Sequence, residues 1–268
     1  LRPENLIKDT STFSLFAKKL SNQFSYSSRQ KNRFVDFSKS INSLQTDVYD
    51  TNIVSINTNF RNSAAFNRFS RIFGLEWINS NLIAKQIQAN GYEMVRLKSN
   101  QVIMLVGISS GFSLRLNYLI DRKIQESEFF QQRSYNIKRN TPSIKLRYIG
   151  ILGFSSEIGY EYEYANNTLG FEVNEMQTLS AELSYSIRSK SWINIKSNFT
   201  KIDFKGILGT PLEYEFLKGF KPGANATWEV NYRRKISTYF EMNIGYNGRY
   251  ISTGDVVHTG SMEIRAIF

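Results

Sequence analysis

The sequence predicts an all-β protein, a single antiparallel up-and-down transmembrane β-barrel of about 12 strands, within a range of ~10–14. Three observations favour this fold class. Apolar and polar residues alternate with a period of two from Phe112 onward, which places one set on each face of a strand. Short turns alternate with long polar connections. Tyr, Trp and Phe gather near the ends of the alternating segments, where the aromatic girdles of membrane barrels lie.

The composition excludes several other classes of protein. The 268 residues carry a net charge of +11 and include 20 Phe, 15 Tyr and 3 Trp, with one His and no Cys. Without Cys there is no disulfide scaffold and no Cys-bearing zinc site. The aromatic content argues against a disordered chain. The longest apolar run, 102–108, is far shorter than the ~20 residues that a transmembrane helix needs.

The N-terminal part of the chain has the weakest pattern. Residues 1–50 form a lead-in that is either a strand or a polar loop. Within it, Thr10 to Leu20 fits both helical and strand spacing, and Arg29 to Ser43 is polar and basic. The barrel itself is predicted from residue 51 to residue 268. Its first strands are expected at 52–60, 70–77 and 102–108.

The later strands are predicted by strict alternation. In each, most alternate residues are apolar and most residues between them are polar or charged, a pattern that a helix would spread over all its faces. These segments are 112–120, 144–148, 154–164, 179–187, 193–199, 226–232, 240–246 and 262–268.

The joints between these segments alternate in length. Short turns at one end and long loops at the other are typical of outer-membrane barrels, which have short periplasmic turns and longer external loops. The short turns are 149–153, 188–191 and 234–237. The long connections are 165–177, 205–224 and 252–258. Before the strand at Trp228, Gly219 to Gly223 predicts a tight turn in which Pro222 fixes φ and Gly223 permits a positive φ.

Alternation alone does not decide which face is wet, because a soluble β-sandwich also alternates. Here charges recur on the polar set of successive strands. The strands, at ~10–14 residues, are longer than the ~5–6 residues typical of globular proteins and reach the ~9–11 that a tilted strand needs to cross a bilayer. We therefore predict a lipid-facing apolar set and a lumen-facing polar set. The predicted lipid-facing residues include Tyr160, Leu183, Tyr185, Ile244 and Ile264. The predicted lumen charges are Glu161, Glu182, Arg188, Glu229, Arg233, Glu241, Glu263 and Arg265.

The last strand ends on an aromatic residue. Met262, Ile264, Ala266 and Phe268 form its apolar set. This arrangement is similar to the C-terminal assembly signal of outer-membrane proteins, so the barrel-insertion machinery is an expected partner, bound by strand pairing.

Several motifs resemble one family. They are Gly219 to Trp228, Tyr246 to Arg249, Val257 to Met262 and Arg265 to Phe268, with Phe60 to Asn62, Phe66 to Arg68 and Phe129 to Tyr135 upstream. Together they resemble the C-terminal segment of long, mostly uncharacterised outer-membrane and surface proteins of Bacteroidota. The resemblance implies an outer-membrane location and is compatible with a chain that forms the terminal part of a larger polypeptide. It implies no activity.

Two sets of residues could carry enzymatic chemistry. His258 lies near Ser261, but three residues along a strand place them on opposite faces, so a nucleophile–base pair is not expected. Glu157, Glu161 and Glu163 share one face. They suit acid–base work, and they equally suit ion pairs across the lumen with Lys145, Arg147 or Arg188, which we favour. Likewise, Glu263 and Arg265 are expected to pair with neighbouring charges such as Glu241 or Arg249.

The predicted function is that of a non-enzymatic outer-membrane barrel, acting as an anchor, a pore or a component of a surface secretion or assembly complex. The alternatives are an outer-membrane hydrolase and a soluble β-sandwich binding module. Neither a cofactor nor a metal is expected. The basic charge is spread over the chain and no nucleic-acid module is present, so the expected partners are outer-membrane lipid and glycolipid, together with other outer-membrane proteins or lipoproteins.

Overall fold

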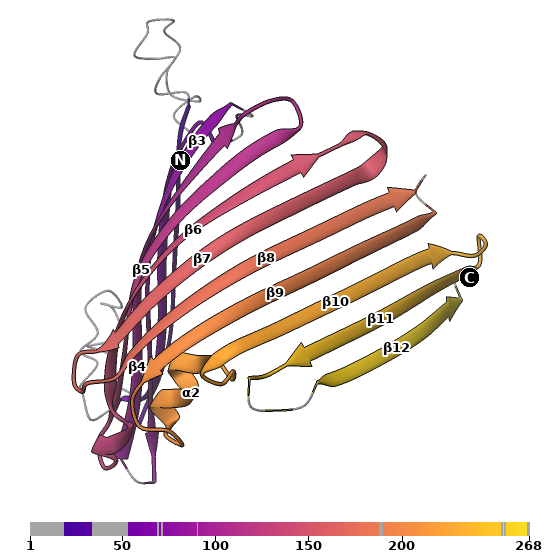
Figure 1. The fold of residues 1–268 in the computed structure, drawn as a ribbon. Helices are drawn as coiled ribbons and strands as arrows, with labels where there is room; N and C mark the ends of the chain where they lie inside the picture. Colours follow the sequence, from indigo (N-terminus) through magenta and orange to yellow (C-terminus); the bar gives the residue numbers. More distant parts are fainter. Residues whose placement is uncertain are drawn as a thin grey trace, which may run out of the picture.

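The computed structural model consists of one sheet of twelve antiparallel strands in sequence order, β1 to β12 (Figure 1). It describes residues 19–33, 53–68, 70, 72–89, 91–187, 190–252, 254 and 256–266. The predicted fold class and strand number are confirmed. The expectations for Arg188, for Phe268 and for most of the lead-in lie outside the described residues. Inside the lead-in, Leu20–Asn32 forms β1, which pairs with β2.

The strands have the lengths expected for crossing a bilayer at a tilt, from 10 residues in β12 to 17 in β4. Their bounds are β1 Leu20–Asn32, β2 Ile53–Phe66, β3 Phe73–Gln88, β4 Gly91–Gly107, β5 Phe112–Ser127, β6 Tyr135–Ile149, β7 Phe154–Asn167, β8 Val173–Ile187, β9 Ser191–Lys205, β10 Gly223–Lys235, β11 Phe240–Tyr250 and β12 Val257–Ala266. The helical elements are η3 Gln131–Arg133, η4 Ile151–Gly153 and α2 Pro211–Leu217.

Several strands extend beyond their predicted limits. The connection expected at 165–177 is only 168–172, because β7 continues to Asn167 and β8 begins at Val173. The added strand residues Ala165, Asn174 and Met176 are buried and lie near α2. The alternating apolar and polar pattern is absent from these strand ends because the residues that face α2 contact protein instead of water. Apolar residues therefore occur on both faces of the strands there.

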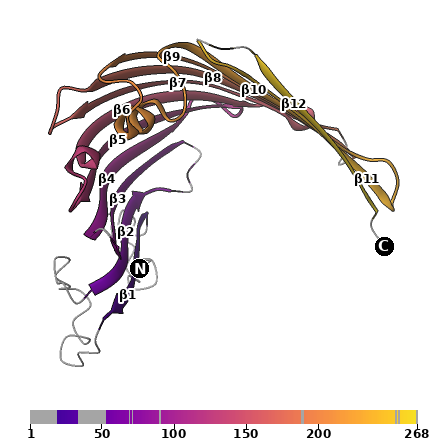
Figure 2. The ribbon, with the colours of Figure 1, turned by 90° about the horizontal axis from the view of Figure 1, so that it is seen from below.

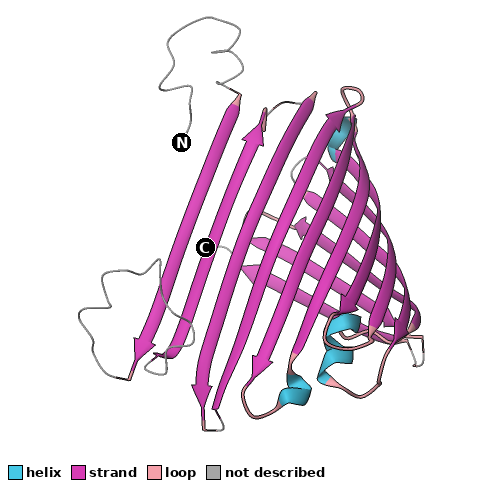
Figure 3. Ribbon diagram, turned by 90° about the vertical axis from the view of Figure 1, so that its left-hand side faces the viewer, coloured by secondary structure: helices cyan, strands magenta, loops and turns pink. Residues whose placement is uncertain are grey.

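The sheet curves into a wall with a concave and a convex face (Figure 2). Its order begins with β1 and ends with β12, and within the described residues these two edge strands are not paired with each other. Figure 3 shows that neighbouring strands are tilted in the same direction, and that α2 and η3 lie close to the same end of the wall. No helix in the described part of the chain is long and apolar enough to cross a membrane.

The two ends of the wall differ. At one end lie the connections that follow the odd-numbered strands, including 206–222, which contains α2. At the other end are short turns such as 108–111, 150–153 and 236–239. β1 begins and β12 ends at this short-turn end, opposite α2 in Figure 1. The usual asymmetry of outer-membrane barrels predicts that the α2 end is the external end.

The concave face is identified by α2, which lies on it (Figure 2). Strand alternation and register assign the remaining residues. Glu161, Glu182, Asn243 and Arg265 fall on the concave face. The predicted lipid-facing residues Tyr160, Leu183, Tyr185, Ile244 and Ile264 fall on the convex face, and all are exposed.

Single cysteines test this assignment, since the chain has none of its own. In intact outer membranes, Glu182→Cys should react with a membrane-impermeant maleimide because a polar lumen admits water. Its neighbour Leu183→Cys should react much less, because lipid covers the convex face. After extraction and denaturation both should react equally, which controls for expression. Stronger labelling at Leu183→Cys in the membrane would contradict the assignment.

Candidate functional site

The most elaborate polar site lies where the β9–β10 connection, 206–222, folds onto the concave face. α2 forms there because local signals favour a short helix. The Thr210 hydroxyl accepts a hydrogen bond from the Glu213 amide at 3.1 Å and caps the helix, and Pro211 occupies its first turn. The helix ends at Leu217, and the next two residues, Lys218 and Gly219, both have positive φ.

The inner side of α2 is apolar and fully covered. Phe216 and Leu217 are 0% and 1% exposed. Phe216 packs with Tyr135, Ile137 and Ala165, from β6 and β7. Leu217 packs with Met176 and Ile202, from β8 and β9. The Asn174 side chain also donates a hydrogen bond to the Phe216 carbonyl at 3.2 Å. Burial of these side chains holds the helix against the wall.

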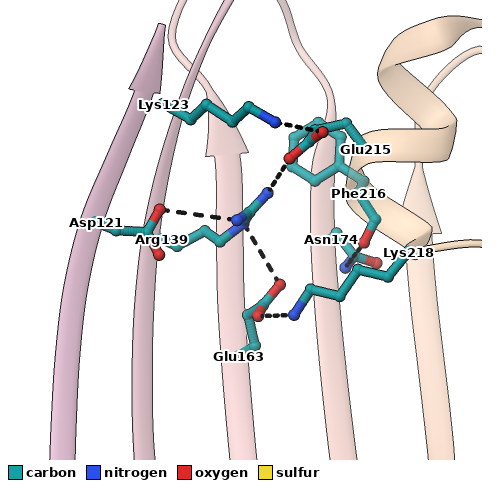
Figure 4. A network of polar contacts seen from close by, with 8 residues as sticks. All are labelled: Asp121, Lys123, Arg139, Glu163, Asn174, Glu215, Phe216 and Lys218. Carbon is teal, nitrogen blue, oxygen red and sulfur yellow. Dashed lines mark hydrogen bonds and ion pairs between the residues drawn. The ribbon is translucent and has the colours of Figure 1, made fainter. Parts of the chain in front are cut away.

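Beside this apolar contact lies an ionic network that joins three strands to the helix (Figure 4). Arg139 of β6 stands at its centre, with its side chain only 12% exposed. Its guanidinium donates to Glu215 of α2 at 2.9 Å. It also lies 3.8 Å from Asp121 of β5 and 3.7 Å from Glu163 of β7, distances at which the attraction is Coulombic. One cation therefore connects four elements.

Two lysines complete the network. Lys123 of β5 donates to Glu215 at 2.7 Å, and Lys218, which caps α2, donates to Glu163 at 2.5 Å. The network thus contains three cations and three carboxylates. That balance matters because the Glu163 side chain is only 4% exposed, and an unpaired charge at such a site is strongly destabilising.

The pKa of the Glu215 carboxyl reflects its role in this network. Burial raises the pKa, but hydrogen bonds from Lys123 and Arg139 outweigh burial, so the pKa lies below its ordinary value of 4.5. Glu215 is therefore ionised whenever α2 is docked at neutral pH.

The second half of the connection is held by β10 and β11. The Asn225 side chain donates to the Lys221 carbonyl at 2.8 Å and is fully buried. Arg249 donates to the Gly219 carbonyl and lies over the Phe220 ring at 5.1 Å. Gly223 has a φ of 104°, as the predicted turn requires. The connection is thus fixed to the wall at both ends.

The predicted lumen charges that the structure describes all lie on the concave face. Glu182 lies 3.9 Å from Lys196. Glu241 lies 3.9 Å from Arg233 of the neighbouring strand, and Arg265 lies 3.3 Å from Glu263 of its own strand. The expected pairing of Glu263 and Arg265 with Glu241 or Arg249 is therefore not what the structure has. The other two predicted lumen charges, Glu161 and Glu229, also lie on the concave face, and Glu229 accepts a hydrogen bond from the Asn231 side chain.

The residues considered for hydrolysis are separated by the wall. His258 lies on the convex face, where its Nδ1 is 2.8 Å from the Tyr246 hydroxyl and its ring is 5.9 Å from that of Trp228. Ser261 lies on the concave face. Glu157 bonds Lys145 at 2.9 Å, and Glu163 belongs to the α2 network. Within the described residues, no group of three or more metal-ligating side chains forms.

Sequence reasoning missed α2 and its network. A helix of seven residues is too short for a periodicity signal, although Thr210, Pro211 and Glu213 form a recognisable capping pattern. The network joins residues as far apart as Lys123 and Glu215, and only the fold brings these together.

Comparison with known proteins supports the fold. No protein-family model and no curated protein matches the chain. Its structure is similar to the siderophore receptor PirA from Acinetobacter baumannii, with a TM-score of 0.63 and 8% identity, over 92% of this chain and 41% of that one. It is also similar to the siderophore receptor PirA from Pseudomonas aeruginosa, with a TM-score of 0.51 and 11% identity, over 77% of this chain and 36% of that one. The chain therefore spans about two fifths of the receptors' length, and at these identities the likeness concerns the fold alone.

Arg139 should dominate the stability of the site. Arg139→Leu leaves buried Asp121 and Glu163 without their shared cation, and we expect it to lower the free energy of unfolding by about 3 kcal/mol. The same change at Arg233, whose side chain is 59% exposed, should cost only ~0–1 kcal/mol. Denaturant titration in lipid measures both losses, and equal values would contradict a special role for Arg139.

Docking of α2 onto the wall should weaken at acidic pH. Because the pKa of Glu215 is lowered in the docked state, its stabilisation is present above about pH 4.5 and is lost as the pH falls through the lowered value. A nitroxide on Tyr214→Cys, a 72% exposed position on α2, reports helix mobility. Mobility should rise on acidification, and Glu215→Gln should abolish that step. An unchanged step in Glu215→Gln would assign the titration to another group.

Proposed function

We propose that the chain forms the wall of an outer-membrane β-barrel that encloses a passage, and that the α2 connection narrows this passage at its external end. The observation that carries the proposal is the inward docking of 206–222. A connection that served only to join two strands would need no buried Phe216, no balanced ionic network and no anchoring at Arg249. Each of these holds the connection inside the barrel instead of over its rim.

The polar concave face supports a water-filled interior. Along β9 it presents Asn194, Lys196, Asn198 and Thr200, while the convex face of the same strand presents Ile193, Ile195 and Phe199. A polar interior and an apolar exterior are typical of outer-membrane pores. In lipid, open sheet edges are not tolerated, so a barrel of this kind requires partners for the edges of β1 and β12.

A passage fits the described residues better than a hydrolase. General acid–base catalysis requires the participating groups within hydrogen-bond reach of one substrate. His258 and the carboxylates Glu157, Glu161 and Glu163 lie on opposite faces of the sheet, so no substrate could contact both sets. The concave carboxylates Glu157 and Glu163 are also already paired with lysines.

The exposed edge strand supports the expected interaction with the insertion machinery. Within the described residues, β12 pairs with β11 alone, and all of the residues of β12 are exposed. A free edge of this kind can add a strand from a partner protein. Met262, Ile264 and Ala266 lie on the convex face of that edge, in keeping with the proposed assembly signal.

Conductance tests the proposed passage. The protein is reconstituted in planar bilayers, and Phe216→Ala combined with Glu215→Gln is used to release α2, since loss of a buried Phe costs about 3–5 kcal/mol. Single-channel conductance should increase in this variant, because the narrowing segment leaves the wall. Tyr214→Ala, on the exposed side of the same helix, should leave it unchanged. If neither the protein nor the released variant conducts ions, the passage is refuted.

A further inference from the structure

The convex face carries a row of three cations close to the external end. Lys98 of β4 is directly opposite Arg122 of β5, and Arg122 is directly opposite Lys138 of β6. All three side chains are exposed. They point away from the α2 network, because Arg122 lies between the concave residues Asp121 and Lys123 and alternation reverses its direction. We call these residues the convex cation row.

The convex cation row has no carboxylate partners in the described part of the chain. Arg122 donates to the Asn136 side chain at 2.8 Å, and neither Lys98 nor Lys138 takes part in an ion pair with a described residue. Asp121, next to Arg122 in sequence, faces the other way, and Glu126, a carboxylate on the convex side of the same strand, lies four residues farther along β5. Like charges directly opposite each other on a sheet are destabilising. Such a row is therefore favourable only where an anion lies against it.

The height of the row on the wall points to one source of anions. Along β5 the convex residues from the short-turn end are Phe112, Leu114, Leu116, Tyr118 and Ile120, all apolar, and the next is Arg122. From Phe112 to Arg122 the strand advances by ~34 Å at ~3.4 Å per residue. A tilt of ~45° reduces this to a height of ~24 Å, close to the ~25 Å apolar band of outer-membrane barrels.

The neighbouring strands show the same change. On β6 the convex side passes from Tyr148, Leu146 and Ile144 to Asn140 and then to Lys138. On β4 it passes from Val106, Met104 and Val102 to Asn100 and then to Lys98. The row thus lies at the border of the apolar band on the α2 side, which is the level of the external headgroups.

We propose that Lys98, Arg122 and Lys138 bind the phosphate groups of the glycolipid in the outer leaflet. This inference rests on the proposed function, since it requires the convex face to contact the outer membrane. Arg122 supplies a planar donor fork that suits phosphate, and the two lysines add point charges on either side of it. Asn166 lies opposite Lys138, so an amide group extends the row at that end for contacts with sugar hydroxyls.

Co-purification tests the proposal. The protein is extracted in mild detergent, and bound glycolipid is measured by native mass spectrometry. The variant K98Q/R122Q/K138Q should retain about tenfold less phosphorylated glycolipid, as expected from the loss of three headgroup contacts. The matched control R61Q/R115Q/R147Q removes the same charge from exposed positions on the concave face and should retain as much as the parent protein. Equal retention in both variants would overturn the proposal.

Added ligands distinguish the sources of phosphate. Phosphorylated glycolipid should raise the thermal unfolding temperature of the delipidated protein, and the same lipid with its phosphates removed should not. An equal shift with inorganic phosphate alone, or with the dephosphorylated lipid, would overturn the proposal. Arg122→Gln alone should reduce the shift, which provides a milder test if the triple variant folds poorly. If the variants conduct normally but retain glycolipid, this inference fails alone; if the protein does not insert into membranes, the proposed function fails.

Discussion

Pairing of every backbone group within the sheet is the constraint on which the rest of this structure depends. In a lipid phase an unpaired amide or carbonyl costs several kcal/mol, so a strand is stable there only between two neighbours. The ten inner strands, β2 to β11, largely satisfy that condition, because each pairs with a neighbour on both sides through long antiparallel registers. Once the registers are fixed, alternation determines the direction of every side chain, and away from α2 most strands carry a largely apolar convex face and a largely polar concave face.

The polar face becomes a site only where α2 covers it. Elsewhere on the concave face, pairs such as Arg233 with Glu241 are exposed and contribute little. Beneath α2, water is excluded, and the attraction between Arg139 and its three carboxylates is correspondingly stronger. Desolvation of these groups would be unfavourable without the burial of Phe216 and Leu217 beside them. Apolar packing and ion pairing are therefore coupled, and neither alone would keep the connection inside the wall.

The parts of this structure that could be predicted from the sequence are those that repeat. Alternation from Phe112 onward predicted the strands and their faces, because the same period of two in apolar and polar residues recurs in one strand after another. β1 was left undecided, since Asn22, Ser28 and Gln30 on its convex face interrupt the apolar set of Leu20, Phe24 and Tyr26. α2 and its network occur once, and they join residues from distant parts of the chain. A periodic sequence pattern cannot predict the contact between Lys123 and Glu215, which are far apart in the chain.

The basic segment around β5 and β6 shows why the fold is needed to interpret charge. In sequence, Arg122, Lys123, Lys138 and Arg139 form a single local excess of positive charge. In the sheet, Lys123 and Arg139 face inward to carboxylates of the α2 network, whereas Arg122 and Lys138 face outward. A shift of one residue in register would exchange the two pairs and leave both the network and the outer face with the wrong charge. Because register determines which cations are neutralised by the protein itself, it also determines which cations can face an external anion, and Lys98, Arg122 and Lys138 are among these.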